Sequence, residues 1–284
     1  MKLQLVETGN FKLDGGAAFG VVPKTLWQKQ YPADENNLCN FKLRSLLIET
    51  ENRKILVDTG IGLKQDDKFL SHYHLHGDQT LIDSLQKMNV RPDDVTDVIL
   101  THLHFDHCGG CIHLDDSGNE IMTFSNATYW VSRSQWDNYQ NSNPREGAVY
   151  FKENMEAIER AGALKLVDED FELLPGVSLR LFNGHTPGLM LPFIQSKEGL
   201  FVFVSDLIPV MASIPTAWVA AYDTMPVVSM REKDTLLTEA VEKGYILVFQ
   251  HDFYVECCTV TKTPKGIKPL DVFSLEDVLG SKIG

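Results

Sequence analysis

A short stretch with three histidines and an aspartate is the part of this sequence best suited to do chemistry. It follows an apolar segment, Asp97 to Thr101, that is typical of a buried strand. The stretch reads Thr101-His102-Leu103-His104-Phe105-Asp106-His107-Cys108-Gly109-Gly110. Ligand sites in α/β sheets gather where strands end, and packing alone gives no reason to bring such polar groups together. The stretch therefore predicts a metal site.

The spacing of these residues indicates more than one metal ion. His102 and His104 are two positions apart, so both side chains point to the same side of an extended chain. Asp106 and His107 are adjacent and must diverge. One ion cannot easily take all of these side chains, but two neighbouring ions can. Mixed nitrogen and oxygen donors suit Zn²⁺, and they also suit Mn, Fe or Co.

Further motifs follow in the order found in the metallo-β-lactamase superfamily. The stretch itself is similar to that family's H-x-H-x-D-H signature. Four other segments resemble its early Asp-Thr-Gly turn, its third-histidine motif, its bridging-aspartate motif and its last histidine: Leu56-Val57-Asp58-Thr59-Gly60, Gly184-His185-Thr186-Pro187-Gly188, Ser205-Asp206-Leu207 and Gln250-His251-Asp252. The resemblance runs from about Leu43 to His251, which makes it more specific than a single motif.

The resemblance implies an α/β fold, an αββα sandwich of two mixed sheets flanked by helices, with a two-metal site at its edge. The ligands of one ion would be His102, His104 and His185; those of the other would be Asp106, His107 and His251, and Asp206 would bridge both. Asp58 would orient a ligating imidazole, because ligand histidines usually donate their other N–H. The implied cofactors are two divalent metal ions per chain, with zinc favoured.

A narrower resemblance concerns the N-terminal segment. Asp14 to Lys24, followed by Trp27, looks like the corresponding part of quorum-quenching N-acyl homoserine lactonases, and methyl parathion hydrolases of the same branch have a related segment. Trp218 and Ala220 to Asp223 also resemble that branch. Without the resemblance, this segment would be interpreted as an ordinary strand and loop. With it, we expect residues 1–40 to be an extension that lines the substrate cleft or a dimer interface.

The leading hypothesis is therefore metal-assisted opening of a lactone ring, most simply that of an N-acyl homoserine lactone, by a hydroxide that bridges the two ions. Asp106 and Asp206 are the candidate catalytic residues, and Asp106 would pass a proton to the leaving alkoxide. Apolar candidates to hold an acyl chain are Phe19, Phe105, Met190 and Trp218. Some lactonases of this branch have a tyrosine after the bridging aspartate, but Leu207 to Val210 contains none. Stabilisation of the oxyanion must then come from the metal or from another group.

Other functions use the same type of site. A hydrolase for a different lactone, an aryl ester or a phosphotriester would need the same metal ligands. A diiron redox protein of this superfamily usually carries a flavin partner domain and a carboxylate-richer site, and the sequence shows neither. Nucleic-acid cleavage and a role in binding alone are the remaining alternatives.

Composition restricts the partners. The chain has 284 residues, of which 43% are hydrophobic and 23% are charged, so it can bury a substantial core. The net charge of −13 disfavours nucleic acid and anionic membranes. No apolar run approaches the ~18 residues that span a bilayer, and the N-terminus lacks the apolar region of a signal peptide. Five cysteines without a regular framework fit a reducing compartment. We expect one cytoplasmic domain, residues 1–284, that binds a small-molecule substrate. A homodimer is possible from the sequence.

Strands and helices must position these residues. Phe41 to Glu49 and Lys54 to Asp58 predict a hairpin. Later strands are predicted at Thr128 to Val131, Val177 to Phe182, Leu189 to Gln195, Leu200 to Ser205 and Ile246 to Phe249. Helices are predicted at Gln79 to Met88, from Ser132 toward Tyr139, at Lys152 to Ala161, and at Met230 to Lys243 with Ser229 as its cap and Gly244 as its end. Asn141 to Gly147 is a polar break. The order of elements favours two sheets with helices outside them.

Two other patterns resemble metal or redox sites but lack the necessary partners. His72, His74 and His76 alternate without a neighbouring carboxylate or cysteine, so we expect a solvated loop near the rim of the cleft. Cys108 and Cys111 have C-x-x-C spacing, yet no second such pair follows. We expect these cysteines to pack in the core, with sensitivity of the Cys108 thiol as the alternative.

Overall fold

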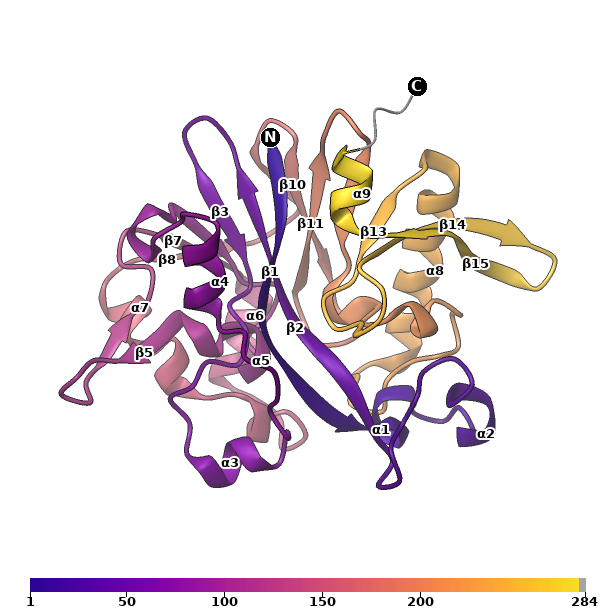
Figure 1. Ribbon diagram of the computed structural model, residues 1–284, viewed down its shortest axis with the longest axis horizontal. Helices are drawn as coiled ribbons and strands as arrows, with labels where there is room; N and C mark the ends of the chain where they lie inside the picture. The colour runs from indigo at the N-terminus through magenta and orange to yellow at the C-terminus, as the bar shows by residue number, and fades with distance from the viewer. Residues whose placement is uncertain (281–284) are drawn as a thin grey trace. The chain divides into compact units, whose positions relative to one another are not determined.

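The computed structural model describes residues 1–280, and the chain divides into two compact units. Unit 1 contains Met1–Asn10 and Leu43–Glu169, and unit 2 contains Phe11–Lys42 and the chain from Asp170 onward. Figure 1 labels many of their helices and strands. The sequence-based expectation of a single domain stays a prediction.

In the described part of the chain, six strands form the first sheet, in the order β1-β2-β3-β4-β7-β8. Their bounds are β1 (Lys2–Asp14), β2 (Leu38–Glu49), β3 (Lys54–Val57), β4 (Asp97–Ile99), β7 (Thr128–Ser132) and β8 (Leu164–Val167). β2 and β3 form the predicted antiparallel hairpin, with Leu46 opposite Val57. The next three pairs are parallel. β1 is the edge strand, so the predicted extension of residues 1–40 begins as part of this sheet.

Helices α4 (Leu81–Lys87), α6 (Arg133–Gln140) and α7 (Glu156–Arg160) supply apolar side chains to the core of unit 1. Leu85, Trp136 and Ile158 from these helices are in the same buried cluster as Val98 and Tyr129 from the strands. Ser132 caps α6 as predicted, because its hydroxyl accepts from the Gln135 amide.

The other elements of unit 1 are short. They are α3 (Asp67–Ser71), α5 (Phe105–Cys108), β5 (Ile112–Leu114), β6 (Glu120–Met122) and the 3₁₀ turns η1 (Pro92–Asp94), η2 (Gly109–Cys111), η3 (Gly147–Val149) and η4 (Lys152–Asn154). The helix predicted at Lys152 to Ala161 is wrong at its start. Met155 has φ −125°, which is outside the helical region and separates η4 from α7.

Unit 2 contains the second sheet, in which the described strands follow the order β15-β14-β13-β12-β11-β10-β9. Their bounds are β9 (Phe171–Leu174), β10 (Val177–Phe182), β11 (Leu189–Gln195), β12 (Leu200–Phe203), β13 (Ile246–Val248), β14 (Cys257–Thr263) and β15 (Gly266–Phe273). β10 and β11 have the predicted bounds and pair antiparallel, and β12 pairs parallel with β13. No helix among residues 1–280 is long and apolar enough to cross a membrane.

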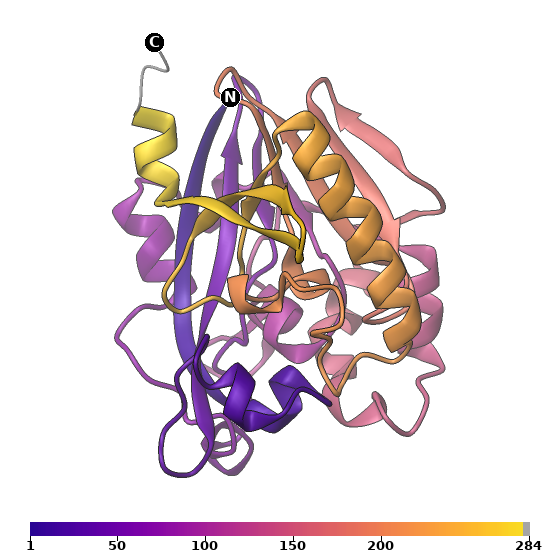
Figure 2. The same ribbon diagram turned by 90° about the vertical axis from the view of Figure 1, so that its right-hand side faces the viewer.

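The long helix α8 (Pro226–Lys243) runs across one face of this second sheet (Figure 2). Leu236, Leu237 and Ala240 bury their side chains against the strands. The predicted start of this helix is wrong, because it begins at Pro226 and Ser229 lies inside its first turns. Gly244 ends it as predicted, with φ 68°. Shorter elements of unit 2 are α1 (Gly15–Phe19), α2 (Lys24–Trp27), η5 (Ser205–Leu207), η6 (Met211–Ser213) and α9 (Leu275–Gly280).

Candidate metal centre

The histidine-rich stretch of unit 1 forms a compact group, which we call the unit 1 cluster: His102, His104, Asp106 and His107. It follows β4 and continues into α5. His102 Nε2 lies 3.0 Å from His104 Nδ1, and His107 Nε2 lies 3.6 Å from Asp106 Oδ2. The rings of His102 and His107 are 3.8 Å apart between centroids, and both side chains are buried. The structure thus brings together the four residues that the spacing singled out in this stretch.

Asp58 orients two imidazoles of this cluster. Its buried carboxylate accepts from the Thr101 amide and hydroxyl, both at 2.8 Å, and lies 2.9 Å from His107 Nδ1. Because the Thr101 hydroxyl gives its hydrogen to Asp58, its oxygen accepts from His102 Nδ1 at 3.1 Å. The N–H of each ring is therefore on Nδ1, and each Nε2 carries a lone pair. Asp58 also has φ 57°, a strained value for a residue other than glycine.

The backbone beside Asp58 fastens the start of α5. The Thr59 amide donates to the His107 carbonyl oxygen at 2.7 Å, and the Thr59 hydroxyl donates to the same oxygen at 3.0 Å. Gly109 follows α5 in close contact with this turn, since a Cβ there would lie 1.9 Å from the Ile61 carbonyl oxygen. Only glycine allows this approach, which explains the residue type after the cluster.

The unit 2 cluster contains His185, Asp206 and His251. β10, β12 and β13 run in the same direction, so their carboxyl ends lie at the same edge of the second sheet. His185 follows β10, Asp206 lies in η5 after β12, and His251 follows β13. Asp206 Oδ2 lies 3.3 Å from His185 Nε2, and Asp206 Oδ1 lies 3.0 Å from His251 Nε2. Each carboxylate oxygen thus faces a different imidazole.

The other ring nitrogen of each histidine in unit 2 also meets an oxygen. His185 Nδ1 lies 2.9 Å from Asp223 Oδ1, and His251 Nδ1 lies 2.8 Å from the Lys42 carbonyl oxygen. The Ser229 hydroxyl donates to the second oxygen of Asp223 at 2.6 Å. This bond also explains why Ser229 does not cap α8. In the sequence, Asp223 belongs to a segment that resembles the lactonase branch, and no motif there assigns it a role.

Helix α8 fastens the loop that carries His185. Glu232 accepts from the backbone amides of Asn183 at 2.7 Å and Gly184 at 2.9 Å, while its burial raises the pKa of its carboxyl group. The next residue, Lys233, is buried and donates from Nζ to the Trp218 carbonyl oxygen at 2.8 Å. Burial lowers the pKa of Lys233 from 10.5 to about 7.

The motifs in the sequence do not indicate a further buried carboxylate, that of Glu146. Glu146 Oε1 lies 3.5 Å from His104 Nε2. Glu146 occurs in the polar break between Asn141 and Gly147, where no motif marks it. The contact depends on the tertiary fold, so no local signal could have found it.

The four apolar candidates for substrate binding are divided between the units, with one in unit 1 and three in unit 2. Phe105, in unit 1, lies 5.2 Å from the Phe69 ring, 4.6 Å from the Tyr73 ring and 6.1 Å from the Phe151 ring, measured between centroids. We call these four residues the unit 1 aromatic group. Burial raises the pKa of Tyr73 to about 12.

The other apolar candidates belong to unit 2. Phe19 stacks on Trp27 at 5.1 Å and meets the half-buried Trp218 edge-on at 6.1 Å. Met190 is buried within β11. The role of all four candidates in substrate binding stays a prediction.

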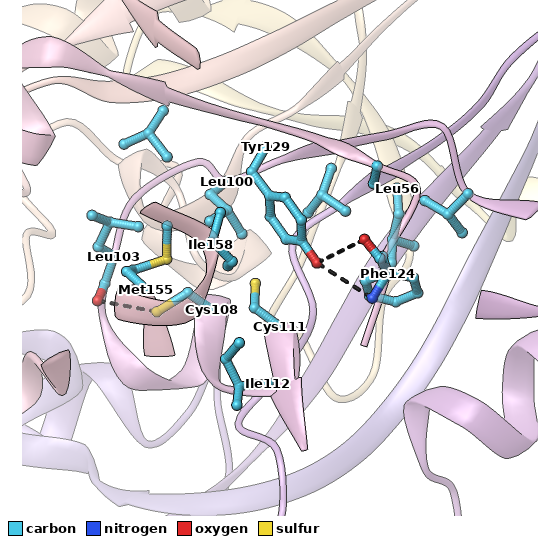
Figure 3. Close-up of a cluster of buried hydrophobic side chains, with 14 of the residues drawn as sticks. Leu56, Leu100, Leu103, Cys108, Cys111, Ile112, Phe124, Tyr129, Met155 and Ile158 are labelled. Atoms are coloured by element: carbon cyan, nitrogen blue, oxygen red, sulfur yellow. Dashed lines mark hydrogen bonds between the residues drawn. The ribbon is translucent and has the colours of Figure 1, made fainter. Parts of the chain in front are cut away.

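The C-x-x-C pair and the alternating histidines lie in environments that fit structural roles. Cys108 and Cys111 are buried among apolar side chains (Figure 3). Burial raises the pKa of Cys111 to about 12, which disfavours its reactive thiolate. His72 and His74 are exposed after α3, and His76 Nδ1 faces the His74 carbonyl oxygen at 3.0 Å.

Comparisons with known sequences agree with the resemblance. The Metallo-beta-lactamase superfamily model matches residues 44–251. An N-acyl homoserine lactonase from Bacillus cereus is 29% identical over 182 residues, which are 60% of this chain and 65% of that protein. The chain thus spans slightly less than two thirds of the length of this curated relative. N-acyl homoserine lactonase AiiB from Rhizobium rhizogenes is 25% identical over 219 residues, covering 72% of this chain and 76% of that protein.

Solved structures extend the similarity over nearly the whole chain. A "probable metal-dependent hydrolase" from Staphylococcus aureus has a TM-score of 0.87 and 32% identity, with 97% of each chain covered. AidC, described as a dizinc quorum-quenching lactonase, has a TM-score of 0.75 at 22% identity over 94% of this chain and 93% of its own, which supports the fold alone. The expected α/β fold is confirmed, and with the family model matching most of its length, this chain belongs to the metallo-beta-lactamase superfamily.

Proposed function

We propose that this protein is a metal-dependent hydrolase that opens the lactone ring of N-acyl homoserine lactones at a site with two divalent metal ions. One observation carries the proposal: each imidazole of the two clusters has one ring nitrogen near an oxygen of its own unit. The acceptor oxygens belong to Thr101, Glu146, Asp58, Asp223 and Lys42, for His102, His104, His107, His185 and His251 respectively. Metal-ligating histidines are oriented in this way, with the second nitrogen left for the metal.

The ligand assignment combines both clusters, as the family motifs imply. One ion would take His102, His104 and His185; the other would take Asp106, His107 and His251, with Asp206 shared. The two oxygens of Asp206 support a bridging role, because each faces a different imidazole. Nitrogen and oxygen donors favour zinc, with Mn, Fe or Co as the other candidates. Two bound ions would supply a water of lowered pKa as nucleophile and polarise the carbonyl group.

The side chains of this protein would divide the remaining work. Asp106 is the partly exposed carboxylate of the unit 1 cluster, with 13% of its side chain accessible, so it can pass a proton to the leaving alkoxide. Asp58 and Asp223 hold the imidazole N–H groups in place. Phe105, with the rest of the unit 1 aromatic group, offers an apolar surface for the acyl chain. The substrate class is supported by curated relatives that are N-acyl homoserine lactonases.

Metal analysis combined with a ring-opening assay tests this function. We expect two metal ions per chain and hydrolysis of N-hexanoyl homoserine lactone, followed by proton release and by mass spectrometry of the ring-opened acid. H102A and D206A should each lower kcat/KM by at least ~100-fold, because a lost ligand removes both the nucleophile and the polarising charge. H113A is the matched control, since His113 is exposed and lies outside both clusters.

Different outcomes would change different parts of the proposal. Zero or one metal ion in the active protein would contradict the two-metal site. Two ions without lactone opening would contradict the substrate class alone. A panel containing an aryl ester and a phosphotriester would then assign the alternative hydrolase activities, and NADH oxidation with bound iron would indicate the diiron alternative.

We also propose that the protein is cytoplasmic and forms a homodimer through its N-terminal segment. The described cysteines are all free thiols, as expected in a reducing compartment. Val21 and Leu26 of that segment are 94% and 51% exposed, so both apolar side chains are available to a partner. Sedimentation should give a dimer that V21D/L26D converts to a monomer. A monomeric wild-type protein would contradict the dimer.

A further inference from the structure

Glu146 is a buried carboxylate near a predicted metal ligand, yet no ligand motif includes it. It lies in the loop between α6 and η3, and only 3% of its side chain is exposed. Burying a carboxylate costs free energy unless donors compensate for the lost water. The donors around Glu146 therefore indicate how its charge is used.

Each oxygen of Glu146 accepts hydrogen bonds from neutral side chains. Oε2 accepts from Asn138 Nδ2 at 3.2 Å and from Asn143 Nδ2 at 2.5 Å, while Oε1 accepts from the Tyr150 hydroxyl at 3.1 Å. An ionised carboxylate can only accept, so the single hydroxyl hydrogen of Tyr150 goes to Glu146. The oxygen of Tyr150 in turn accepts from Asn138 at 3.0 Å and from Gln135 at 2.7 Å.

These hydrogen bonds hold the Glu146 carboxylate beside the ring of His104. Glu146 Oε1 lies 3.5 Å from His104 Nε2, an ion-pair distance rather than a hydrogen bond, and its negative charge favours the tautomer with the hydrogen on Nε2 and the lone pair on Nδ1. Nδ1 then points at His102 Nε2, 3.0 Å away, which is also a lone-pair nitrogen because of Thr101 and Asp58. In that tautomer two lone pairs converge at this distance, which is the arrangement that a metal ion satisfies.

The ring of His104 is also restrained by packing. Its centroid lies 5.1 Å from that of Tyr150. Tyr150 therefore has two contacts that restrain His104. Its ring packs against the imidazole, and its hydroxyl donates to the Glu146 carboxylate beside that imidazole. Helix α6 supplies Gln135 and Asn138 from one face, because residues three apart lie on the same side of a helix.

We propose that Glu146 is a positioning residue for the metal ligand His104. Held by Asn138, Asn143 and Tyr150, its carboxylate selects the Nε2–H tautomer and aims Nδ1 of His104 at the metal. The inference rests on the proposed two-metal function. Removal of such a carboxylate partner typically lowers metal affinity ~10- to 100-fold. The competing interpretation is that Glu146 only fastens its loop to α6.

The first experiment compares E146Q with E159Q, which makes the same change at an exposed glutamate of α7. Chelator competition should show that E146Q weakens one of the two bound ions ~10- to 100-fold, whereas E159Q behaves like wild type. Unfolding midpoints are then measured for each variant with and without metal. A loop-fastening role lowers both midpoints equally, but a positioning role reduces the stabilisation gained from metal. Wild-type affinities in E146Q for both ions would overturn the proposal.

The second experiment needs neither metal nor activity. In metal-free protein with ¹⁵N-labelled histidine, the ring nitrogen shifts report the tautomer, and H104A assigns the His104 signals among the nine histidines. We expect Nε2–H in wild type and a mixture of tautomers in E146Q. Y150F keeps the carboxylate and should shift the tautomer less. An unchanged His104 tautomer in E146Q would overturn the proposal.

These experiments separate the two proposals. If wild-type protein binds two ions but leaves lactones intact, the substrate class fails and the role of Glu146 stands. If wild-type protein binds no metal, the proposed function fails, and the tautomer measurement still decides whether Glu146 orients His104.

Discussion

Asp58 and Asp223 have corresponding positions in the two clusters, each holding the N–H of a histidine ring with a buried carboxylate. Asp58 accepts three hydrogen bonds, two from Thr101 and one from His107. D58N keeps the shape but places an amide hydrogen against one of these donors. We expect metal affinity to fall ~10- to 100-fold and the free energy of unfolding to fall by ~1–3 kcal/mol. Isothermal titration and urea unfolding measure the two effects.

D116N is the control for this change, because Asp116 is exposed in a turn of the same unit. It should leave both measurements at wild-type values. Wild-type metal affinity in D58N would show that the carboxylate charge does not orient the imidazoles.

Lys233 gives a second prediction for a single side chain, and it concerns pH. The folded protein has a Lys233 pKa of about 7 against 10.5 for an ordinary lysine, because burial disfavours the charged form. Between these values the unfolded chain binds more protons, so the contribution of Lys233 to stability increases as pH rises from 7 to 10.5. The substitution K233M removes this pH-dependent contribution to stability. We expect K233M to be more stable than wild type near pH 6.5, with an advantage of about 3–5 kcal/mol that disappears near pH 10.5.

Urea unfolding of wild type and K233M across this pH range checks the sign. K233M also loses the hydrogen bond to Trp218, which lowers its free energy of unfolding by ~1 kcal/mol at every pH. The quantity to compare is therefore how the difference in stability between K233M and wild type changes with pH. K165M, at an exposed lysine of β8, should show no such dependence. A difference between K233M and wild type that stays constant with pH would contradict the lowered pKa.

At the scale of elements, helix α8 both covers the second sheet and fixes the loop of a predicted ligand. Gly184 lies against this helix, and a Cβ there would come within 2.3 Å of the Ser229 amide nitrogen. G184A must therefore push the His185 loop away from α8. We expect a loss of ~1–3 kcal/mol in the free energy of unfolding, together with weaker metal binding.

Chemical denaturation and metal titration of G184A measure these effects. G280A is the matched control, because a Cβ at Gly280 has open space. If G184A binds metal as tightly as wild type, contact with α8 does not position His185.

The elements also show where sequence patterns suffice and where they do not. β10 and β11 were predicted because their apolar runs are bounded by polar turns. The missed strand β15 exposes Leu270 and Val272, so its pattern lacks the alternation of a half-buried strand. The start of α8 was misplaced because the Ser229 hydroxyl bonds Asp223 instead of capping the helix.

For the site, nearness in the chain and resemblance to family motifs decided what could be predicted. His102, His104, Asp106 and His107 lie within six positions, so their grouping is visible in the sequence. Asp223 and Glu146 reach their histidines only through tertiary contacts. The roles of Asp223 and Glu146 were therefore hidden, although Asp58 and the residues that would bind metal were visible in the motifs.

At the scale of the whole molecule, each unit carries part of the proposed set of ligands. The unit 1 cluster supplies three imidazoles and a carboxylate, and the unit 2 cluster supplies two imidazoles and a carboxylate. If both clusters bind the same ions, as proposed, metal binding must stabilise the two units together. Hydrogen exchange of metal-loaded protein should then show slower exchange around His102 and around His251 than in metal-free protein.

A ligand substitution in one unit makes this prediction decisive. H102A removes a ligand from unit 1 and leaves every side chain of unit 2 unchanged. If the ions are shared, metal should protect the peptides around His185 and His251 less in H102A than in wild type, because the affinity of the common site has fallen. H113A should retain the wild-type protection. Full metal protection of unit 2 in H102A would mean that unit 2 binds its own ion, and the two-metal site would have to be divided between the units.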